Sequence, residues 1–261
     1  MLQPSSRGGF VMVVRLLPLV LCLLVSDALA VKAEYAVRWD VTDPAALKGR
    51  PGSADDVVAK LPQTTARRPA PVTSAITEYD DVQAPPGLPA GYEAALRRRE
   101  RDGRFEFRYV VHGPEPRPEA LPDRPPVCGR ISADALPEEH DVTVATAGDA
   151  DRRNVVIACE RVQRSNELPE GFEKAPTPRP CEIRMTRHLV PWDKPGSDGK
   201  PEELRVEEWT YGTRRIVELA WRTDDTPANE QMFRNLAGYV AAGIDIATSP
   251  DKDALSRTCG R

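Results

Sequence analysis

Histidine is scarce in this chain, and the sequence contains none of the usual signatures of a metal or nucleotide site. Only 3 histidines occur in 261 residues, and His112, His140 and His188 lack metal-motif spacing such as H-E-x-x-H. No glycine-rich phosphate loop occurs, and the segment Pro195–Gly199 lacks the Gly-x-Ser-x-Gly spacing of a nucleophile elbow. We therefore expect no metal, no cofactor and no serine-hydrolase centre.

One dense set of polar residues, Glu138 to Asp141, deserves separate mention as a possible ligand set. Neighbouring side chains on a strand point to opposite faces. The four groups therefore cannot all converge on one ion, and we assign no metal ligands here.

An excess of basic charge is also lacking, as is a second long apolar run. The formal net charge is −4, and the first 30 residues carry Arg7, Arg15 and Asp27, so the remainder has −5. Nucleic-acid binding requires a basic face, and we expect no nucleic-acid partner. No later stretch is long and apolar enough for a transmembrane segment.

The N-terminus has the pattern of an export signal. A polar start is followed by an apolar run from Leu16 to Val25 and by Ala28-Leu29-Ala30, a small-x-small cleavage site. We expect cleavage near Ala30, a mature chain beginning near Val31, and a periplasmic or secreted location.

Cleavage would remove Cys22 and leave four cysteines. An even number in an oxidising compartment indicates two disulfides, for which three pairings are possible. We favour Cys128–Cys159, which joins a proline-rich loop to a strand, and Cys181–Cys259, which ties down the tail. No thiolate would then be free for catalysis or metal binding.

Apolar residues in alternate positions predict most of the secondary structure as strands. Helices are predicted from Ser53, a capping residue, to Pro62, over 92–101, and over 227–247 after the N-cap Thr226. Residues 62–90 are interpreted as a loop or extended edge and the tail after Pro250 as irregular. The predicted strands are 34–41, 105–111, 140–147, 153–162, 181–190, 203–211 and 214–223.

The expected fold is α+β, with a mainly antiparallel sheet of six or seven strands and the 227–247 helix buried on one face. Leu88-Pro-Ala-Gly-Tyr-Glu93 resembles Leu168-Pro-Glu-Gly-Phe-Glu173, which suggests an internal repeat of two three-stranded meanders. The expected divisions are a signal peptide (1–30), an N-terminal strand and helix (31–62), a first meander with proline-rich loops (63–165) and a second meander with the C-terminal helix and tail (166–261).

With no motif for catalysis, we expect an exported, disulfide-stabilised, non-catalytic binding protein of the cell envelope. Its partner would be a protein, as for an inhibitor or immunity protein, or a small ligand, with Trp192 as a possible contact. One alternative is an envelope hydrolase using a carboxylate pair on glycan or peptidoglycan. Another is a structural envelope component. Perturbed carboxylates in one deep pocket would favour the hydrolase, and an exposed aromatic on a flat surface would favour the binder.

Overall fold

The protein folds as a closed barrel, so the expected α+β sheet of two meanders is wrong. The computed structural model describes residues 31–62, 68–148, 151–195 and 201–259. Nine strands of mixed direction close the barrel, two short strands lie outside it, and only 17% of the chain is helical. The expected signal peptide lies outside the described residues.

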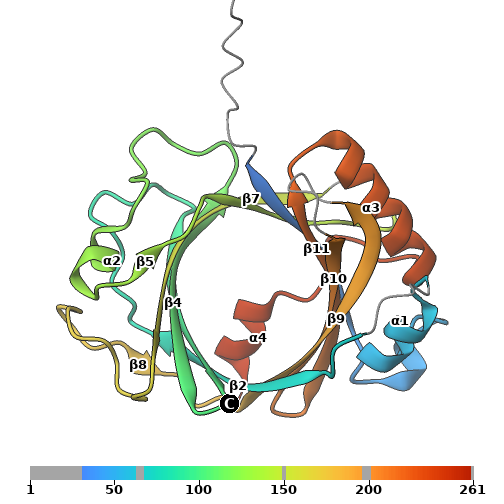
Figure 1. Ribbon diagram of the computed structural model, residues 1–261, viewed down its shortest axis with the longest axis horizontal. Coiled ribbons are helices and arrows are strands. Elements are labelled where there is room, and N and C mark those ends of the chain that lie inside the picture. Colours follow the sequence, from blue (N-terminus) through green and yellow to red (C-terminus); the bar gives the residue numbers. More distant parts are fainter. Residues whose placement is uncertain (1–30, 63–67, 149–150, 196–200, 260–261) are drawn as a thin grey trace, which may run out of the picture.

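The strands follow one another around the barrel in the order β3-β4-β7-β6-β1-β11-β10-β9-β2, and pairing of β2 with β3 closes the ring (Figure 1). Among the strand pairs of the described residues, only β1–β6 is parallel. The strands are β1 (Lys32–Asp40), β2 (Val72–Asp80), β3 (Glu93–Arg101), β4 (Arg104–Pro114), β6 (Glu139–Thr143), β7 (Arg152–Gln163), β9 (Ile183–Pro195), β10 (Pro201–Tyr211) and β11 (Arg214–Asp224), with the short outer strands β5 (Asp134–Ala135) and β8 (Thr177–Pro178).

The apolar face of these strands points outward, and the charged face lines the barrel. On β1, Tyr35, Val37 and Trp39 are almost fully buried in an outer cluster, whereas Glu34 and Arg38 line the interior cavity. Alternation along a strand reveals two faces. It does not reveal which face a closed barrel will turn inward.

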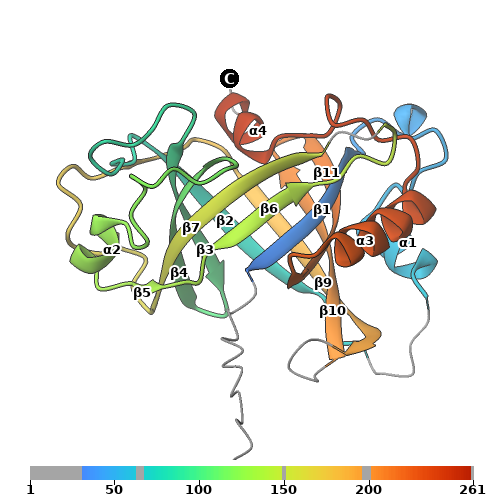
Figure 2. The same cartoon turned by 90° about the horizontal axis from the view of Figure 1, so that it is seen from above.

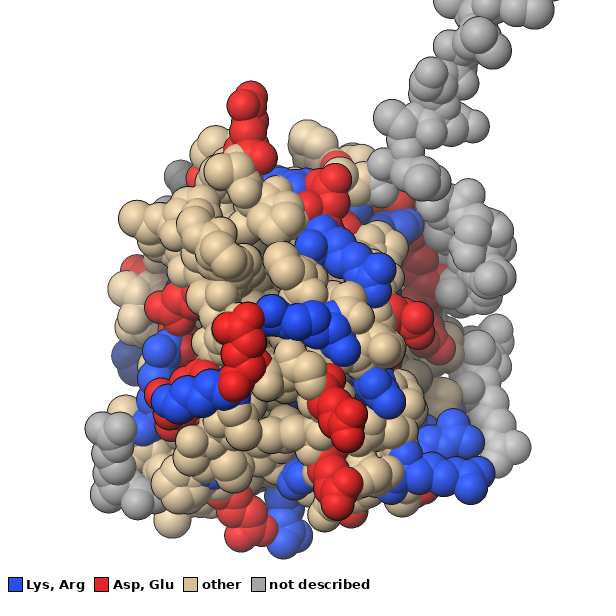
Figure 3. Space-filling view, turned by 90° about the vertical axis from the view of Figure 1, so that its left-hand side faces the viewer, with Lys and Arg blue, Asp and Glu red and all other residues tan. Residues whose placement is uncertain are grey.

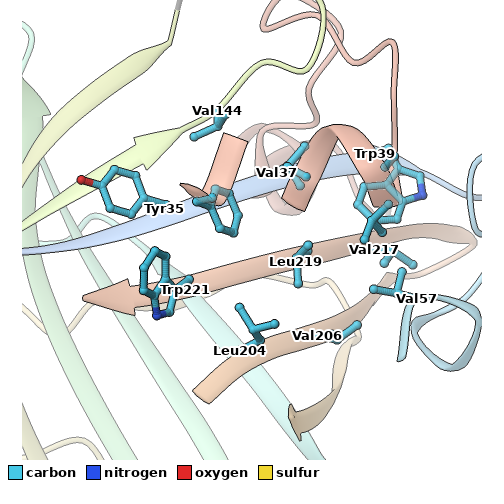
Figure 4. Packing of buried hydrophobic residues seen from close by; sticks show 14 of the residues in the cluster. Tyr35, Val37, Trp39, Val57, Val144, Leu204, Val206, Val217, Leu219 and Trp221 are labelled. Atoms are coloured by element: carbon cyan, nitrogen blue, oxygen red, sulfur yellow. The ribbon is translucent and has the colours of Figure 1, made fainter. Parts of the chain in front are cut away.

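Helices and loops cover the apolar outer face. Figure 1 shows α1 (Ala54–Lys60) and α3 (Pro227–Val240) beside β9, β10 and β11, and α2 (Pro126–Arg130) on the opposite side. Phe233 of α3 stacks on Tyr35, with ring centroids 6.1 Å apart. Figure 4 shows the side chains of β1, β10 and β11 that meet in this cluster.

The last helix closes one end of the barrel. α4 (Lys252–Thr258) lies across the opening in Figure 1 and at the top of the barrel in Figure 2. Leu255 packs against an apolar group inside that end, and the Cys181–Cys259 disulfide fixes the helix C-terminus. The sequence predicts an irregular tail here, and this prediction is wrong, because a helix of 7 residues is too short to show a clear apolar period.

Three further assignments change. Residues 92–101, expected as a helix, form β3, because Arg97 and Arg99 line the cavity while Leu96 packs outside. The 62–90 segment contains β2, an element that its proline- and threonine-rich composition concealed. The 227–247 helix ends at Val240, where Ala241 leaves helical geometry.

Other predictions are confirmed. Ser53 Oγ accepts from Asp56 N at the start of α1, and Thr226 Oγ1 accepts from Asn229 N at the start of α3. β9, β10 and β11 form the expected antiparallel meander. The prediction of a first meander is wrong, because β6 lies between β7 and β1 and runs parallel to β1.

Candidate functional site

The barrel encloses a cavity of about 420 Å³, which we call the lumen. This volume lies within the range of small-molecule pockets. All nine barrel strands and α4 contribute to its lining, and most of the side chains are charged. The acidic members are Glu34, Glu78, Glu106, Glu139, Asp141, Glu160, Glu207, Glu218, Asp251 and Asp253, and the basic members are Arg38, Arg97, Arg99, Arg108, Arg152, Arg179, Arg187, Arg205 and Lys252.

Near α4 the lumen charges form a dense ion-pair network around Glu218. This carboxylate is 1% exposed, pairs with Arg38 and lies 2.8 Å from Lys252 Nζ. Burial alone would raise the pKa of Glu218, but Arg38 and then Lys252 outweigh it and lower the pKa strongly. The network therefore holds a buried charge and fastens α4 to the barrel wall.

Trp209 lies beside this network on the lumen side of β10. Its Nε1 donates to Glu207 Oε2 at 2.8 Å, and Lys252 Nζ lies 4.0 Å from the ring centroid. Glu207 also accepts from Arg187 Nε at 2.6 Å. Trp209 thus packs among the charged side chains of the lumen wall.

Some polar atoms of the lumen lack hydrogen-bond partners. Arg108 Nε, Arg205 Nε and Asp141 Oδ1 are buried and have no hydrogen-bond partner among the described residues. Burial, and then the neighbouring Arg97, lower the pKa of Arg108. Buried polar groups in native proteins are nearly always satisfied, and exceptions often mark functional sites.

A cross-strand carboxylate pair also faces the lumen. Glu34 of β1 is in direct register with Asp141 of β6. Burial would raise the pKa of Glu34, but Arg205 lowers it to about 2. Burial raises the pKa of Asp141, although Arg38 opposes the rise. One of two adjacent carboxyls is therefore held ionised, and the other is biased toward its neutral form.

The low pKa of Glu34 predicts an acid-dependent loss of stability. A carboxyl with a depressed folded pKa stabilises the protein above the unfolded value, and this contribution is lost as pH falls through the folded pKa. We expect Glu34→Gln to destabilise the protein at pH 7, and the difference from wild type to shrink as pH falls from 4.5 to about 2. Urea unfolding at several pH values measures this. The exposed control Glu203→Gln should give no such convergence, and a constant Glu34→Gln deficit would contradict the assignment.

The three histidines lie in different surroundings. His112 lines the lumen, whereas His188 Nε2 lies 3.7 Å from Asp55 of α1, so the two do not share a site. Glu139, His140 and Asp141 all border the lumen, but the His140 ring binds Asp225, on the opposite strand face from its two neighbours. Glu138 pairs with Arg117 instead.

Outside the barrel, Glu115, His140 and Asp225 offer ligand atoms within 4.8 Å of one another. His140 Nδ1 lies 2.5 Å from Asp225 Oδ2 and 3.1 Å from Glu115 Oε1. Arg153 already bridges the two carboxylates, at 3.1 Å from Glu115 and 2.7 Å from Asp225. A guanidinium thus supplies the positive charge that a metal ion would bring, and we assign no ion to this cluster.

The structure contains both disulfides in the favoured pairing, Cys128–Cys159 and Cys181–Cys259. Two disulfides are typical of proteins from oxidising compartments. Trp192, the possible partner contact, is half-buried on the outer face of β9, and its ring centroid lies 4.6 Å from that of Trp221. Its role in partner binding stays a prediction.

No helix among the described residues is long and apolar enough to cross a membrane. On the face shown in Figure 3, basic and acidic side chains are interspersed and neither sign forms a continuous patch. Comparison with known protein families and with curated proteins finds no match for this chain. The site therefore has to be interpreted from its own geometry, which is that of a disulfide-linked mixed barrel with a charged lumen.

Sequence reasoning missed the lumen residues as a group. Arg97 and Arg99 fall in the segment predicted as a helix, and Glu34, Arg108, Asp141 and Arg205 fall in predicted strands to which no interior role is assigned. Charged residues in alternate positions occurred in nearly every strand. That regularity was a usable signal for a polar interior, but an ordinary exposed sheet face has the same pattern.

Proposed function

We propose that this chain is an exported binding protein that holds a small polar ligand inside its barrel. The observation that carries the proposal is the lumen itself, a cavity of about 420 Å³ lined by charged side chains, several of which have buried polar atoms without a hydrogen-bond partner among the described residues. Placing this many charges in a closed interior is costly unless they are paired. A barrel interior with a purely structural role would be expected to pair all of these charged groups. A binding site instead keeps some hydrogen-bond donors and acceptors for its ligand.

The small size of the lumen favours a small molecule over a protein partner. It also favours a compact ligand over a polymer such as peptidoglycan. The two disulfides support an extracytoplasmic location, and the periplasm or the medium after cleavage near Ala30 remains part of the proposal.

Filling the lumen tests the proposal. Ala95 of β3 lines the cavity, so Ala95→Phe should occupy part of the space that a ligand needs. We expect the mature wild-type protein to gain thermal stability with some members of a panel of small polar metabolites, and Ala95→Phe to lose that gain. The control Ala46→Phe places the same side chain at an exposed surface position and should respond like wild type.

Circular dichroism must show that Ala95→Phe retains the barrel. Equal responses of wild type and a folded Ala95→Phe would place binding elsewhere, and the proposal would fail.

One observation favours a second function, the carboxylate hydrolase. Glu34 and Asp141 are direct cross-strand neighbours whose pKa values are shifted in opposite directions, and such a separation is typical of an acid–base pair. Perturbed carboxylates in one deep cavity are also the feature that would favour a hydrolase over a binding protein. Product analysis of the same panel decides between the two functions, because turnover that Asp141→Asn abolishes would establish the hydrolase.

A further inference from the structure

We infer that Arg97 and Arg108 form an anion subsite in the lumen, so that the ligand carries a carboxylate or phosphate group. This inference rests on the proposed function, since it names the chemistry of the ligand that the lumen would hold. The two arginines are in direct register on the neighbouring strands β3 and β4, and both line the cavity. Like charges directly opposite one another destabilise a sheet, so a negatively charged group between these two arginines would be stabilising.

Most of the other lumen arginines have acidic partners, and Arg152, which has none among the described residues, is exposed. Arg38 pairs with Glu218, Arg99 with Glu106, Arg187 with Glu207 and Arg205 with Glu34. Among the described residues, Arg97 forms neither an ion pair nor a hydrogen bond with an acid. Its guanidinium lies over the ring of Trp209, 5.7 Å from the centroid. Arg97 is therefore a lumen cation whose charge no nearby carboxylate has neutralised by direct contact.

Arg108 has only one distant acidic contact in the lumen. Its nearest acidic contact is Glu139, 4.0 Å away, and Glu139 already pairs with Arg222. Its Nε has no hydrogen-bond partner. The Arg108 side chain keeps 27% of its surface exposed on a strand face that lines the lumen, so a ligand can reach part of this side chain, although Nε itself is buried.

The acids that stand opposite these two arginines are engaged elsewhere. Glu78 of β2 is in register with Arg97 but binds Arg179 at 2.9 Å and Ser256. Glu160 of β7 is in register with Arg108 but forms no ion pair with it among the described residues. Burial and the adjacent Glu106 raise the pKa of Glu160, which weakens it further as a counter-charge.

Two guanidinium groups with unfilled N–H donors suit an oxyanion. A guanidinium binds carboxylate or phosphate oxygens through paired, charge-assisted hydrogen bonds. An anion placed between Arg97 and Arg108 would relieve their repulsion and satisfy the free donors.

Calorimetric titration of the mature protein, with both disulfides intact, tests the subsite. The probes are succinate, inorganic phosphate, the neutral analogue succinamide and the cation putrescine. We expect succinate or phosphate to bind, and the comparison of the two distinguishes a carboxylate from a phosphate ligand. Arg97→Gln and Arg108→Gln should each weaken that binding about tenfold or more, while Arg184→Gln, an exposed arginine paired with Glu182, should not.

Thermal unfolding without ligand separates this role from a structural one. Because Arg97→Gln removes a repulsion and breaks no ion pair, we expect its midpoint to equal or exceed that of wild type. A lower midpoint with unchanged anion affinity would overturn the inference. Binding of succinamide or putrescine without either anion would also overturn it but leave the proposed function standing, whereas binding of no probe here or in the wider panel would contradict the proposed function itself.

Discussion

Glu218→Ala is expected to lower the free energy of unfolding by about 3–5 kcal/mol, since it breaks a buried ion pair by removing one partner. Glu218 is 1% exposed and is contacted by Arg38 and Lys252. Its loss would leave two buried cations without their common counter-charge. It would also release α4, because Lys252 is the first residue of that helix. Urea unfolding of the purified mature protein measures the change.

Two comparisons make this prediction specific. Glu203→Ala removes an exposed carboxylate on the neighbouring strand and should change stability by no more than about 0.5 kcal/mol. The double variant Glu218→Ala with Lys252→Met removes one stranded cation as well and should recover part of the loss. A Glu218→Ala deficit below about 1 kcal/mol would contradict a network in which this carboxylate is central.

Removal of the Cys181–Cys259 disulfide is the second change with a large expected effect. The two cysteines are 78 residues apart, so their link restricts a long loop of the unfolded chain. We expect Cys181→Ala with Cys259→Ala to cost about 2–5 kcal/mol. Because this disulfide also fixes the end of α4, its loss should open that end of the lumen and make Trp209 more accessible to a soluble quencher.

The second disulfide provides the matched control. Cys128 and Cys159 are 31 residues apart and lie in the outer cluster on the other side of the barrel. Cys128→Ala with Cys159→Ala should reduce stability but leave quenching of Trp209 unchanged in the folded state. Equal quenching in both double variants would show that α4 does not depend on Cys259 for its position.

Much of the secondary structure could be predicted from local patterns. β4 and β11 follow from alternation, and α1 and α3 follow from their capping residues Ser53 and Thr226. Local patterns do not define closure of the sheet. The pairing of β2 with β3 joins segments that were interpreted as a loop and a helix, and without that contact the remaining strands look like an open sheet packed on α3.

The same limitation concealed the candidate site. The lumen collects residues from nine strands, and Glu34 meets Asp141 only because β6 lies parallel beside β1. No spacing along the chain encodes that neighbour. The disulfide pairing was easier to predict from the sequence. Cys128–Cys159 joins a proline-rich loop to a strand, and Cys181–Cys259 ties down the tail.

The most direct test of a ligand-binding lumen is fluorine NMR of the protein labelled with 5-fluorotryptophan. Of the four tryptophans, Trp209 lines the lumen, whereas Trp39, Trp192 and Trp221 belong to the outer apolar cluster. Addition of the best-binding probe should shift the resonance of Trp209, assigned with Trp209→Phe, and leave the other three nearly unchanged. A shift of Trp192 without one of Trp209 would place binding on the outer surface and contradict the account.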